Sequence, residues 1–397
     1  MLRTGSICTS FLYKYITSSV DDGDNFQQQK KRMKILGDVF ADCGGVLSKV
    51  SQIINIDTNN YSNNVFSECK PYNEDKTIEF ICNEIKSITE ITDFDKCIFK
   101  SGSIGQVHKA KLLDGSDIVV KVQYYNLLQQ FEIDIEIIKN IMKYIFSQYN
   151  SWEKAIVQSE KTLYEELDYK NEIKNHIKFF SLWENDNNIK ISKVYEDLST
   201  DKIIIMEYIN GKSLSSFLIE STQDDKNIVA FNLFKFIFQS MFKYGLFYCD
   251  IHVGNFLIKD DNTLCVLDFG HINKIDEKTL NNLKLLYLSL YNDDKDLFYV
   301  VVKDLGILTD KIDTDEELEH MYEQFKIYIE PLLCKTKYTF KKNWISELNM
   351  FTNLTSGWEI PSNITYLLKI PNGLFFILCN LEASFNMSDF ILEVTKI

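Results

Sequence analysis

Asp250-Ile-His-Val-Gly-Asn255 and, a short distance downstream, Asp268-Phe-Gly270 are the two strings that decide the fold of this chain. Both lie in segment 245–271, where short β-type runs alternate with turns. Metal-assisted phosphoryl transfer needs a carboxylate that orients and deprotonates the acceptor hydroxyl, and an amide with a second carboxylate that hold Mg²⁺ on nucleotide phosphates. Asp250, Asn255 and Asp268 supply this set, and Mg²⁺ prefers hard oxygen ligands. We therefore predict Asp250 as the catalytic base and Asn255 and Asp268 as metal ligands.

The order of the strings carries more information than either string alone. Asp-Phe-Gly occurs by chance in many proteins, and an isolated Asp-x-His-x-x-Asn string also fits a turn with an Asx cap. Here the interval from Asp250 to Asn255 is that of the protein-kinase catalytic loop, and Asp268 follows after a short strand pair. A candidate phosphate-binding lysine and a candidate hinge precede them in the order that a kinase needs. The combination favours a protein-kinase-like chain.

Upstream, Lys100-Ser-Gly-Ser-Ile-Gly-Gln-Val107 resembles a glycine-rich nucleotide loop. Against the kinase pattern G-x-G-x-x-G-x-V it supplies Gly102, Gly105 and Val107, with Lys100 at the place of the first glycine. The two glycines allow the backbone to approach phosphate closely. We therefore predict that Gly102, Ser103, Gly105 and Val107 line a nucleotide pocket.

The candidate phosphate-binding lysine is Lys121, which lies in an alternating apolar run that predicts a strand. In kinases this lysine contacts the α- and β-phosphates and pairs with a carboxylate on a nearby helix. Glu172 is the candidate partner, on a helix predicted over 152–183. The alternatives on the same predicted helix are Glu165, Glu166 and Asp168. A solvated lysine on an edge strand would show the same local pattern.

The run Ile204-Ile-Met206-Glu207-Tyr208 predicts the strand and hinge that meet the adenine. Met206 is expected at the back of the pocket, with Glu207 and Tyr208 in the hinge. A buried edge strand without a ligand would show the same pattern.

Composition limits the class of protein. With 397 residues, 45% hydrophobic and 13% aromatic, the chain can bury a large core and more readily two lobes. A net charge of −14 without a dominant basic cluster argues against nucleic acid as a partner. Nine cysteines without a Cys-x-x-Cys pair predict neither disulfides nor zinc, and favour a reducing compartment. The longest apolar runs fall short of the roughly 20 residues that a transmembrane helix needs.

The pattern along the chain predicts a strand-rich half followed by a helix-rich half. Asp114-Gly115 between two β-branched runs is a hairpin signal. The first twenty residues contain Arg3 and Lys14 without an acid, a weak transit-peptide pattern, so the cytoplasm and the mitochondrion both stay open as locations. The other predicted elements are helices near 30–56, 77–89, 126–149, 152–183, 228–244 and beyond 279, and strands at 191–194 and 202–208.

The chain resembles the UbiB or aarF-domain family of atypical kinases from about Lys34 to Ile272. The resemblance is carried by Ser-Ile-Gly-Gln-Val-His-Lys-Ala, Val-Val-Lys-Val-Gln, Glu-Leu-Asp-Tyr-Lys-Asn-Glu, Met-Glu-Tyr-Ile-Asn-Gly, Asp-Ile-His-Val-Gly-Asn and Leu-Asp-Phe-Gly. The first and third strings are the most specific to this family. Among the departures, Val119 stands where the family has alanine against the adenine, and Ile251 and Val253 replace prolines. None of these departures removes a reacting group.

The resemblance implies an α+β, bilobal protein-kinase-like fold, with a strand-containing N-lobe, a helical N-terminal extension and a helical C-lobe. The extension carries a Lys-x-Gly-Gln motif, here Lys49 and Gln52, which would partner Glu166 and Asp168 and restrict access to the site. The implied domains are a tail at 1–30, the extension at 31–95, the N-lobe with its Glu-x-Asp insertion at 96–210 and the C-lobe at 211–397.

The function that follows is an atypical kinase or ATPase that binds ATP and Mg²⁺ and acts in ubiquinone or related isoprenoid-lipid metabolism. Its expected partners are a nucleotide and a prenyl lipid or membrane surface. The alternatives are a nucleotide-gated pseudokinase that scaffolds a complex or chaperones a lipid without phosphoryl transfer, and a small-molecule kinase of the choline or aminoglycoside type. Small-molecule kinases of the choline or aminoglycoside type lack the Ser-Ile-Gly-Gln-Val-His string.

Overall fold

The computed structural model describes residues 74–85, 89–102, 104–145, 160, 164–307, 314–342, 361, 364–368 and 370–396. The chain divides into two compact units. Unit 1 comprises Met1–Ile177 and Lys193–Tyr208, and unit 2 comprises Lys178–Ser192 and Ile209–Ile397. Helix α7 (Tyr169–Trp183) begins in unit 1 and ends in unit 2. No helix within the described residues is long and apolar enough to cross a membrane.

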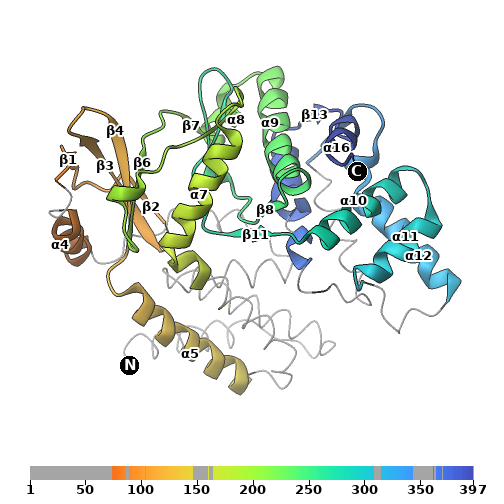
Figure 1. The fold of residues 1–397 in the computed structure, drawn as a ribbon, viewed down its shortest axis with the longest axis horizontal. Helices are drawn as coiled ribbons and strands as arrows, with labels where there is room; N and C mark the ends of the chain where they lie inside the picture. Colours follow the sequence, from red (N-terminus) through yellow and green to blue (C-terminus); the bar gives the residue numbers. More distant parts are fainter. Residues whose placement is uncertain are drawn as a thin grey trace, which may run out of the picture. The chain divides into compact units, whose positions relative to one another are not determined.

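Unit 1 is built on an antiparallel five-stranded sheet, shown in Figure 1. The strand order is β1-β3-β4-β6, and β2 also pairs with β3. The elements of this unit besides α7 are α4 (Glu74–Ile85), β1 (Ile91–Thr92), β2 (Lys100–Ser101), β3 (Gly105–Leu112), β4 (Asp117–Gln123), α5 (Leu127–Ile145), the 3-10 helix η2 (Glu196–Leu198) and β6 (Ile203–Glu207).

The predicted hairpin joins β3 and β4. Gly115 has a φ of +85°, a left-handed conformation that L residues other than Asn and Asp rarely adopt. The Asp114 side chain accepts the amide hydrogen of Ser116 at 2.8 Å, so the turn satisfies its own backbone. The sequence prediction of a hairpin at Asp114-Gly115 is therefore confirmed.

Alternation along β4 gives this sheet two different faces. Ile118, Val120 and Val122 are fully buried on one face, which α4 helps to cover. The opposite face carries Val119 and Lys121. Because Val107 of β3 lies directly across from Lys121, it belongs to the same face. We call the face that carries Val107, Val119 and Lys121 the lysine face.

Unit 2 is largely helical, with short strands. One sheet has the order β5-β10-β9-β7, and two further pairs are β11-β8 and β12-β13. Its elements are β5 (Ile189–Ile191), β7 (Lys212–Ser213), α8 (Leu214–Glu220), α9 (Gln223–Phe242), β8 (Leu246–Tyr248), η3 (Val253–Asn255), β9 (Phe256–Ile258), β10 (Leu264–Val266), β11 (Ile272–Lys274), α10 (Glu277–Tyr291), α11 (Lys295–Asp304), α12 (Asp315–Tyr328), α13 (Glu330–Leu333), β12 (Tyr338–Thr339), η4 (Thr365–Leu368), the π-helix η5 (Ile370–Phe375), α15 (Phe376–Asn380), β13 (Ser384–Phe385) and α16 (Ser388–Val394).

Helix α9 organises the core of unit 2. It begins at a capping box, in which Thr222 and Asp225 each bond the backbone amide of the other. Asp225 also accepts a hydrogen bond of 2.7 Å from the Asn262 side chain, which fixes the turn between β9 and β10 to the start of the helix. Most of α9 is buried in one large aromatic core that includes Phe269. The turn between β9 and β10, which precedes Asp268, is thus anchored to a helix that is largely buried in the core.

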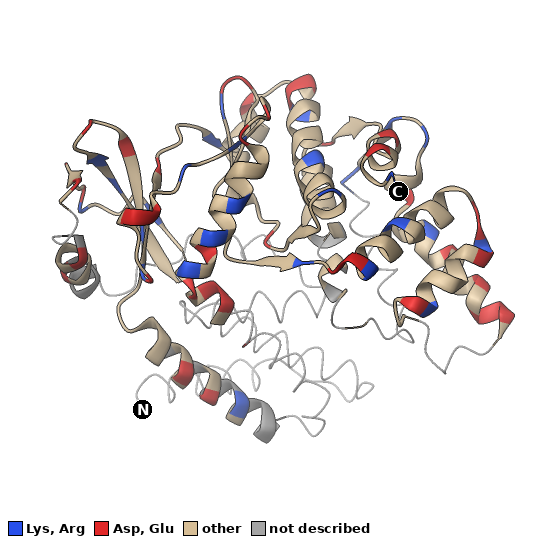
Figure 2. Cartoon of the chain, in the orientation of Figure 1, with Lys and Arg blue, Asp and Glu red and all other residues tan. Residues whose placement is uncertain are grey.

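Acidic and basic residues are interspersed along the described elements of both units (Figure 2). Helix α7 carries three lysines at four-residue intervals, whereas α12 begins with three consecutive acids. This distribution agrees with the net charge of −14.

Three details of the predicted organisation differ in the structure. The helix predicted over 152–183 is interrupted at Asp168, and α7 starts at Tyr169. The strand predicted at 191–194 is divided: Ile191 ends β5, which pairs in parallel with β10 of unit 2, and Val194 forms an isolated antiparallel bridge with Met206 of β6. Strand β1, assigned to the 31–95 extension, pairs with β3 in the sheet of unit 1. The α+β class is confirmed. Lys49, Gln52 and Ser103 lie outside the described residues.

Candidate active site

The predicted lysine and its predicted partner lie together in unit 1. The Lys121 ammonium donates to Oε1 of Glu172 at 2.6 Å, and the two side chains are 14% and 2% exposed. The same ammonium lies 5.2 Å from the centre of the Tyr169 ring. Burial makes a charge costly unless it is paired, so the two groups hold each other in the charged form and in one geometry.

The first turn of α7 explains why Glu172, rather than the neighbouring acids, meets the lysine. Asp168 is exposed and acts as the N-cap, because its side chain accepts the amide hydrogen of Asn171 at 3.1 Å. Glu166 is buried and precedes the cap, whereas Glu165 is partly buried. The predicted contact of Glu166 and Asp168 with the Lys-x-x-Gln motif involves residues outside the described ranges.

The glycine-rich loop is closed by its own backbone. The amide of Gly102 donates to the carbonyl of Gly105 at 2.8 Å, and the Tyr124 hydroxyl donates to the Gly102 carbonyl at 3.0 Å. A Cβ at Gly105 would lie 2.3 Å from the carbonyl oxygen of Val122, whereas a Cβ at Gly102 would meet nothing closer than 3.5 Å. Gly105 is therefore required by packing, and Gly102 is not.

The remaining predicted nucleotide-binding residues lie along the lysine face and the end of β6. Val119 pairs with Met206 across the ladder, and both belong to one apolar cluster with Tyr169. Glu207 accepts the amide of Lys193 at 3.3 Å, so its carboxylate is occupied by the preceding loop. The Tyr208 amide donates to the Asp117 carbonyl at 3.1 Å, which fixes the predicted hinge to the sheet.

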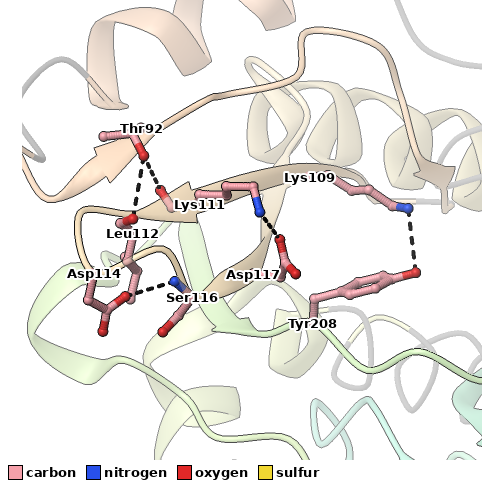
Figure 3. A network of polar contacts seen from close by, with 8 residues as sticks. All are labelled: Thr92, Lys109, Lys111, Leu112, Asp114, Ser116, Asp117 and Tyr208. Atoms are coloured by element: carbon pink, nitrogen blue, oxygen red, sulfur yellow. Dashed lines mark hydrogen bonds and ion pairs between the residues drawn. The ribbon is translucent and has the colours of Figure 1, made fainter.

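Sequence reasoning missed one cluster at this end of the sheet. The Lys109 ammonium lies 4.2 Å from the centre of the Phe99 ring and 4.6 Å from that of Tyr208. It also donates to the Tyr208 hydroxyl at 3.4 Å (Figure 3). Lys109 lies two residues after the glycine-rich string that ends at Val107, and this two-residue spacing was the only local sign that it shares the lysine face.

The opposite face of β3 carries a buried polar pair. His108 Nδ1 lies 2.9 Å from the Asp95 carbonyl, which can only accept, so Nδ1 carries the hydrogen and Nε2 accepts from Gln106 at 3.0 Å. Burial lowers the pKa of His108 below its ordinary value, and the ring packs 5.1 Å from that of Phe94. The neutral imidazole is thus a structural part of this strand.

In unit 2, the predicted catalytic loop is held by the predicted metal ligand. Asn255 Nδ2 donates to both the carbonyl oxygen and Oδ2 of Asp250, at 2.9 and 2.7 Å. His252 Nδ1 accepts the amide of Gly254 at 3.0 Å. A Cβ at Gly254 would lie 2.9 Å from this nitrogen, so a larger residue there would displace the His252 ring. The five-residue interval seen in the sequence therefore corresponds to one closed turn.

Asp268 and Phe269 follow β10 after one intervening residue, Leu267. Asp268 Oδ1 accepts the amide of Gly270 at 2.9 Å, which orients the carboxylate. Phe269 is fully buried in the core of unit 2, 4.9 Å from the Phe179 ring. The aspartate is thus anchored on both sides, by a turn and by an aromatic residue.

The structure adds Gly373 to the surroundings of the catalytic loop. A Cβ at this position would lie 2.8 Å from both Cβ and the carbonyl oxygen of Ile251. Gly373 lies in the π-helix η5, and such helices occur frequently at functional sites. In the sequence, Pro371-Asn-Gly373 predicts only a turn. The contact that gives this glycine its importance is tertiary and has no local signal.

The donor set in unit 2 fits Mg²⁺. Asn255 uses its amide nitrogen on Asp250, so its oxygen Oδ1 is the atom left to bind a cation. Among the described residues, no group of three or more His, Cys, Asp or Glu side chains clusters as a metal site. Mg²⁺ is usually bound by one or two protein oxygens together with substrate phosphates and water, for which Asn255 and Asp268 suffice.

Comparison with known proteins identifies the fold. An uncharacterized protein encoded in the hydrogenase 1 5' region of Clostridium pasteurianum is 25% identical over 381 residues, which cover 92% of this chain and 70% of that protein. AarF domain-containing protein kinase 1 of Xenopus laevis is 30% identical over 250 residues, 60% of this chain and 47% of the kinase. The solved complex of Rv3197 with erythromycin from Mycobacterium tuberculosis has a TM-score of 0.69 at 19% identity, covering 93% of this chain and 96% of that one.

The chain thus spans less than half the length of the Xenopus kinase. Similarity to the Mycobacterium structure extends over nearly the whole of both chains and shows a shared fold. The family model described as the ABC1 atypical kinase-like domain matches residues 64–301, more than half of the chain. The predicted kinase-like fold is confirmed, and this chain belongs to the ABC1 atypical kinase-like family, which includes AarF domain-containing protein kinases.

Proposed function

We propose that this protein is an Mg²⁺- and ATP-dependent phosphotransferase or ATPase. The observation that supports the proposal most is the ion pair between Lys121 and Glu172, 2.6 Å long and nearly buried. Active protein kinases need this pair between a strand lysine and a helix glutamate. A buried lysine and glutamate could also serve packing alone, but hydrophobic residues fill such a position at lower cost.

In this proposal each side chain has a defined task. Lys121, held by Glu172, contacts the α- and β-phosphates, and Asn255 and Asp268 hold Mg²⁺. Asp250 accepts the proton of the attacking hydroxyl or water, and the hydrogen bond from Asn255 to its Oδ2 orients the carboxylate. When bound, Mg²⁺ neutralises charge that develops on the phosphates. Asn255 then acts twice, since it also orients the base.

The glycine-rich loop and the lysine face supply the rest of the nucleotide site in this proposal. Gly102, Ser103 and Gly105 cover the phosphates, and Val107 and Val119 pack against the base. The hinge is formed by Met206, Glu207 and Tyr208. Lys49, Gln52, Glu166 and Asp168 are proposed to regulate access to the site.

The segment after Gly270 favours a small acceptor over a protein. Only residues 271–276 lie between Gly270 and α10, and within them β11 pairs with β8. In protein kinases this interval holds the activation loop that receives the protein substrate. We propose water or a lipid as the acceptor, and a role in ubiquinone or related isoprenoid-lipid metabolism inside the cell, in the cytoplasm or in mitochondria.

Transfer of label from [γ-³²P]ATP tests the proposal. The wild type should release labelled phosphate or label an isoprenoid-lipid acceptor in the presence of Mg²⁺, and Asp250→Asn should lower the rate by at least about 100-fold, as loss of a general base does. Binding of ATP without any transfer of label would reject phosphoryl transfer and support the nucleotide-gated scaffold instead. An unchanged rate in Asp250→Asn would reject the assigned base.

A further inference from the structure

Phe99, Lys109 and the hinge residue Tyr208 form a compact cluster in unit 1, in which Phe99 and Lys109 have no role in the proposed chemistry. The Lys109 ammonium contacts the rings of Phe99 and Tyr208, at 4.2 and 4.6 Å from their centres. The rings themselves meet edge to face, at 6.0 Å and 71°. An ammonium over an aromatic face is attracted by the ring quadrupole, so each ring holds the lysine and the lysine holds both rings. The three side chains therefore fix one another.

The backbone directs Phe99 toward this cluster. Lys100 pairs with Val107 in the β2–β3 ladder, yet the amide of Phe99 also donates to the Val107 carbonyl, at 2.9 Å. Two consecutive residues that oppose one residue make a β-bulge, which redirects a side chain. The bulge explains how the side chain of Phe99, which lies just outside β2, reaches Lys109 on β3.

The cluster lies at the hinge end of the lysine face. Lys109 is directly across from Val119, and Val119 is two residues from Lys121, or about 7 Å along the strand. Tyr208 is the first residue after β6. If Lys121 contacts phosphates, the base of the nucleotide extends toward this end of the face. Phe99 is 46% exposed, so part of its ring remains accessible beside the lysine.

We propose that Phe99, Lys109 and Tyr208 form a cation–π clamp that holds the Phe99 ring as a stacking platform for the base, and that the clamp makes the site prefer purine nucleotides. The inference rests on the proposed nucleotide site and deepens it. Bases stack on aromatic side chains, and a purine offers a larger π-surface than a pyrimidine. A rigid platform binds better than a mobile one because less side-chain freedom is lost on binding.

The simpler explanation is that an exposed phenylalanine covers the stem of a lysine. Single exposed apolar residues are common, and lysine stems often pack on apolar surface. Packing of the stem alone, however, would leave the ammonium in water, whereas here the ammonium itself contacts both rings. The clamp and the stem explanation therefore predict different affinities for ATP when only the charge of Lys109 is removed.

The test compares variants of the full chain by calorimetric titration with Mg²⁺ and three probes: ATP, CTP and inorganic tripolyphosphate, which has no base. Wild type should bind ATP more tightly than CTP. Lys109→Met should raise the Kd for ATP roughly fivefold, the loss expected for one partly desolvated cation–π contact, and leave that for tripolyphosphate unchanged. Lys109→Arg should keep the wild-type affinity, because guanidinium also stacks on rings.

Lys111→Met is the matched control. Lys111 lies on the same strand and face, but its ammonium pairs with Asp117 at 2.6 Å instead of contacting a ring (Figure 3). This variant should bind all three probes as wild type does. Phe99→Leu, which keeps apolar volume, should lower ATP affinity like Lys109→Met, and thermal unfolding verifies that each variant is folded.

The outcomes separate the inference from the function on which it rests. Suppose that the wild type binds ATP, and that Lys109→Met and Phe99→Leu either bind ATP equally well or lose as much affinity for tripolyphosphate as for ATP. The clamp is then wrong and the nucleotide site stands. If wild type binds none of the three probes, the proposed function fails and the clamp fails with it.

Discussion

Removal of one charge from the Lys121–Glu172 pair should destabilise the protein strongly. The atoms are 2.6 Å apart, so at an effective dielectric constant of about 20 their attraction is about 6 kcal/mol before desolvation. Desolvation offsets much of this attraction in the wild type, but Glu172→Gln leaves the lysine without its countercharge. Breaking a buried pair costs about 3–5 kcal/mol. Because Lys121 keeps 14% exposure and can reach water, we expect a loss of about 2–3 kcal/mol.

A double-mutant cycle in urea measures the coupling directly. The single variants Glu172→Gln and Lys121→Met are compared with the double variant, and we expect a coupling energy of about 2 kcal/mol. The control pair is Lys111–Asp117, which has the same length of 2.6 Å but side chains 45% and 64% exposed. Exposed pairs contribute about 0–1 kcal/mol. Equal coupling energies in the two pairs would refute the claim that burial gives the Lys121 pair its strength.

Three further predictions concern single positions. The free energy of unfolding should fall as the pH drops below about 6.5. Burial lowers the pKa of His108 in the folded chain, so the unfolded chain binds the proton more tightly. Urea titrations measure the free energy of unfolding at about pH 5.5 and 7.5, and the difference between the two values should be smaller in His108→Gln than in the wild type. Gly102→Ala should change the ratio of ATP to ADP affinity, measured by titration, with little effect on stability. Gly105→Ala should instead unfold at a lower urea concentration, since its Cβ would lie 2.3 Å from a carbonyl oxygen. Equal urea midpoints for the two variants would reject the packing argument. Gly373→Ala should cost about 1–3 kcal/mol and lower kcat more than it raises the KM for ATP, since the overpacking acts on Ile251 beside Asp250, the proposed catalytic base. A change in KM alone would contradict this.

Local patterns predicted the parts of the fold that depend on neighbours in sequence. The hairpin at Asp114-Gly115 follows from one turn residue and two alternating runs, and the same alternation placed Lys121 opposite the buried residues of β4. The kinase-like fold followed from the order of the strings around Asp250 and Asp268. These features need no knowledge of which distant segments meet.

Features that depend on tertiary contacts were not visible in the sequence. The helix predicted over 152–183 contained four acids that could pair with Lys121, namely Glu165, Glu166, Asp168 and Glu172. In the structure Asp168 is the N-cap of α7, and Glu172, one turn further on, faces the strand. The strand at Ile189–Ile191 pairs in parallel with a segment far along the chain, so its periodicity could not identify its sheet. Lys109 required the bulge at Phe99, and Gly373 required its contact with Ile251.

The central claim is that this chain binds ATP through Mg²⁺ held by Asp268. Thermal unfolding of wild type and Asp268→Asn, each with ATP and either Mg²⁺ or EDTA, tests it most directly. At 100 times Kd a ligand adds about 2.7 kcal/mol of stability, which should raise the Tm of a chain of 397 residues by roughly 3 °C. We expect the wild type to gain this shift only with Mg²⁺ and Asp268→Asn to lose it. An equal shift with EDTA, or in the variant, would show that Asp268 does not bind ATP through Mg²⁺.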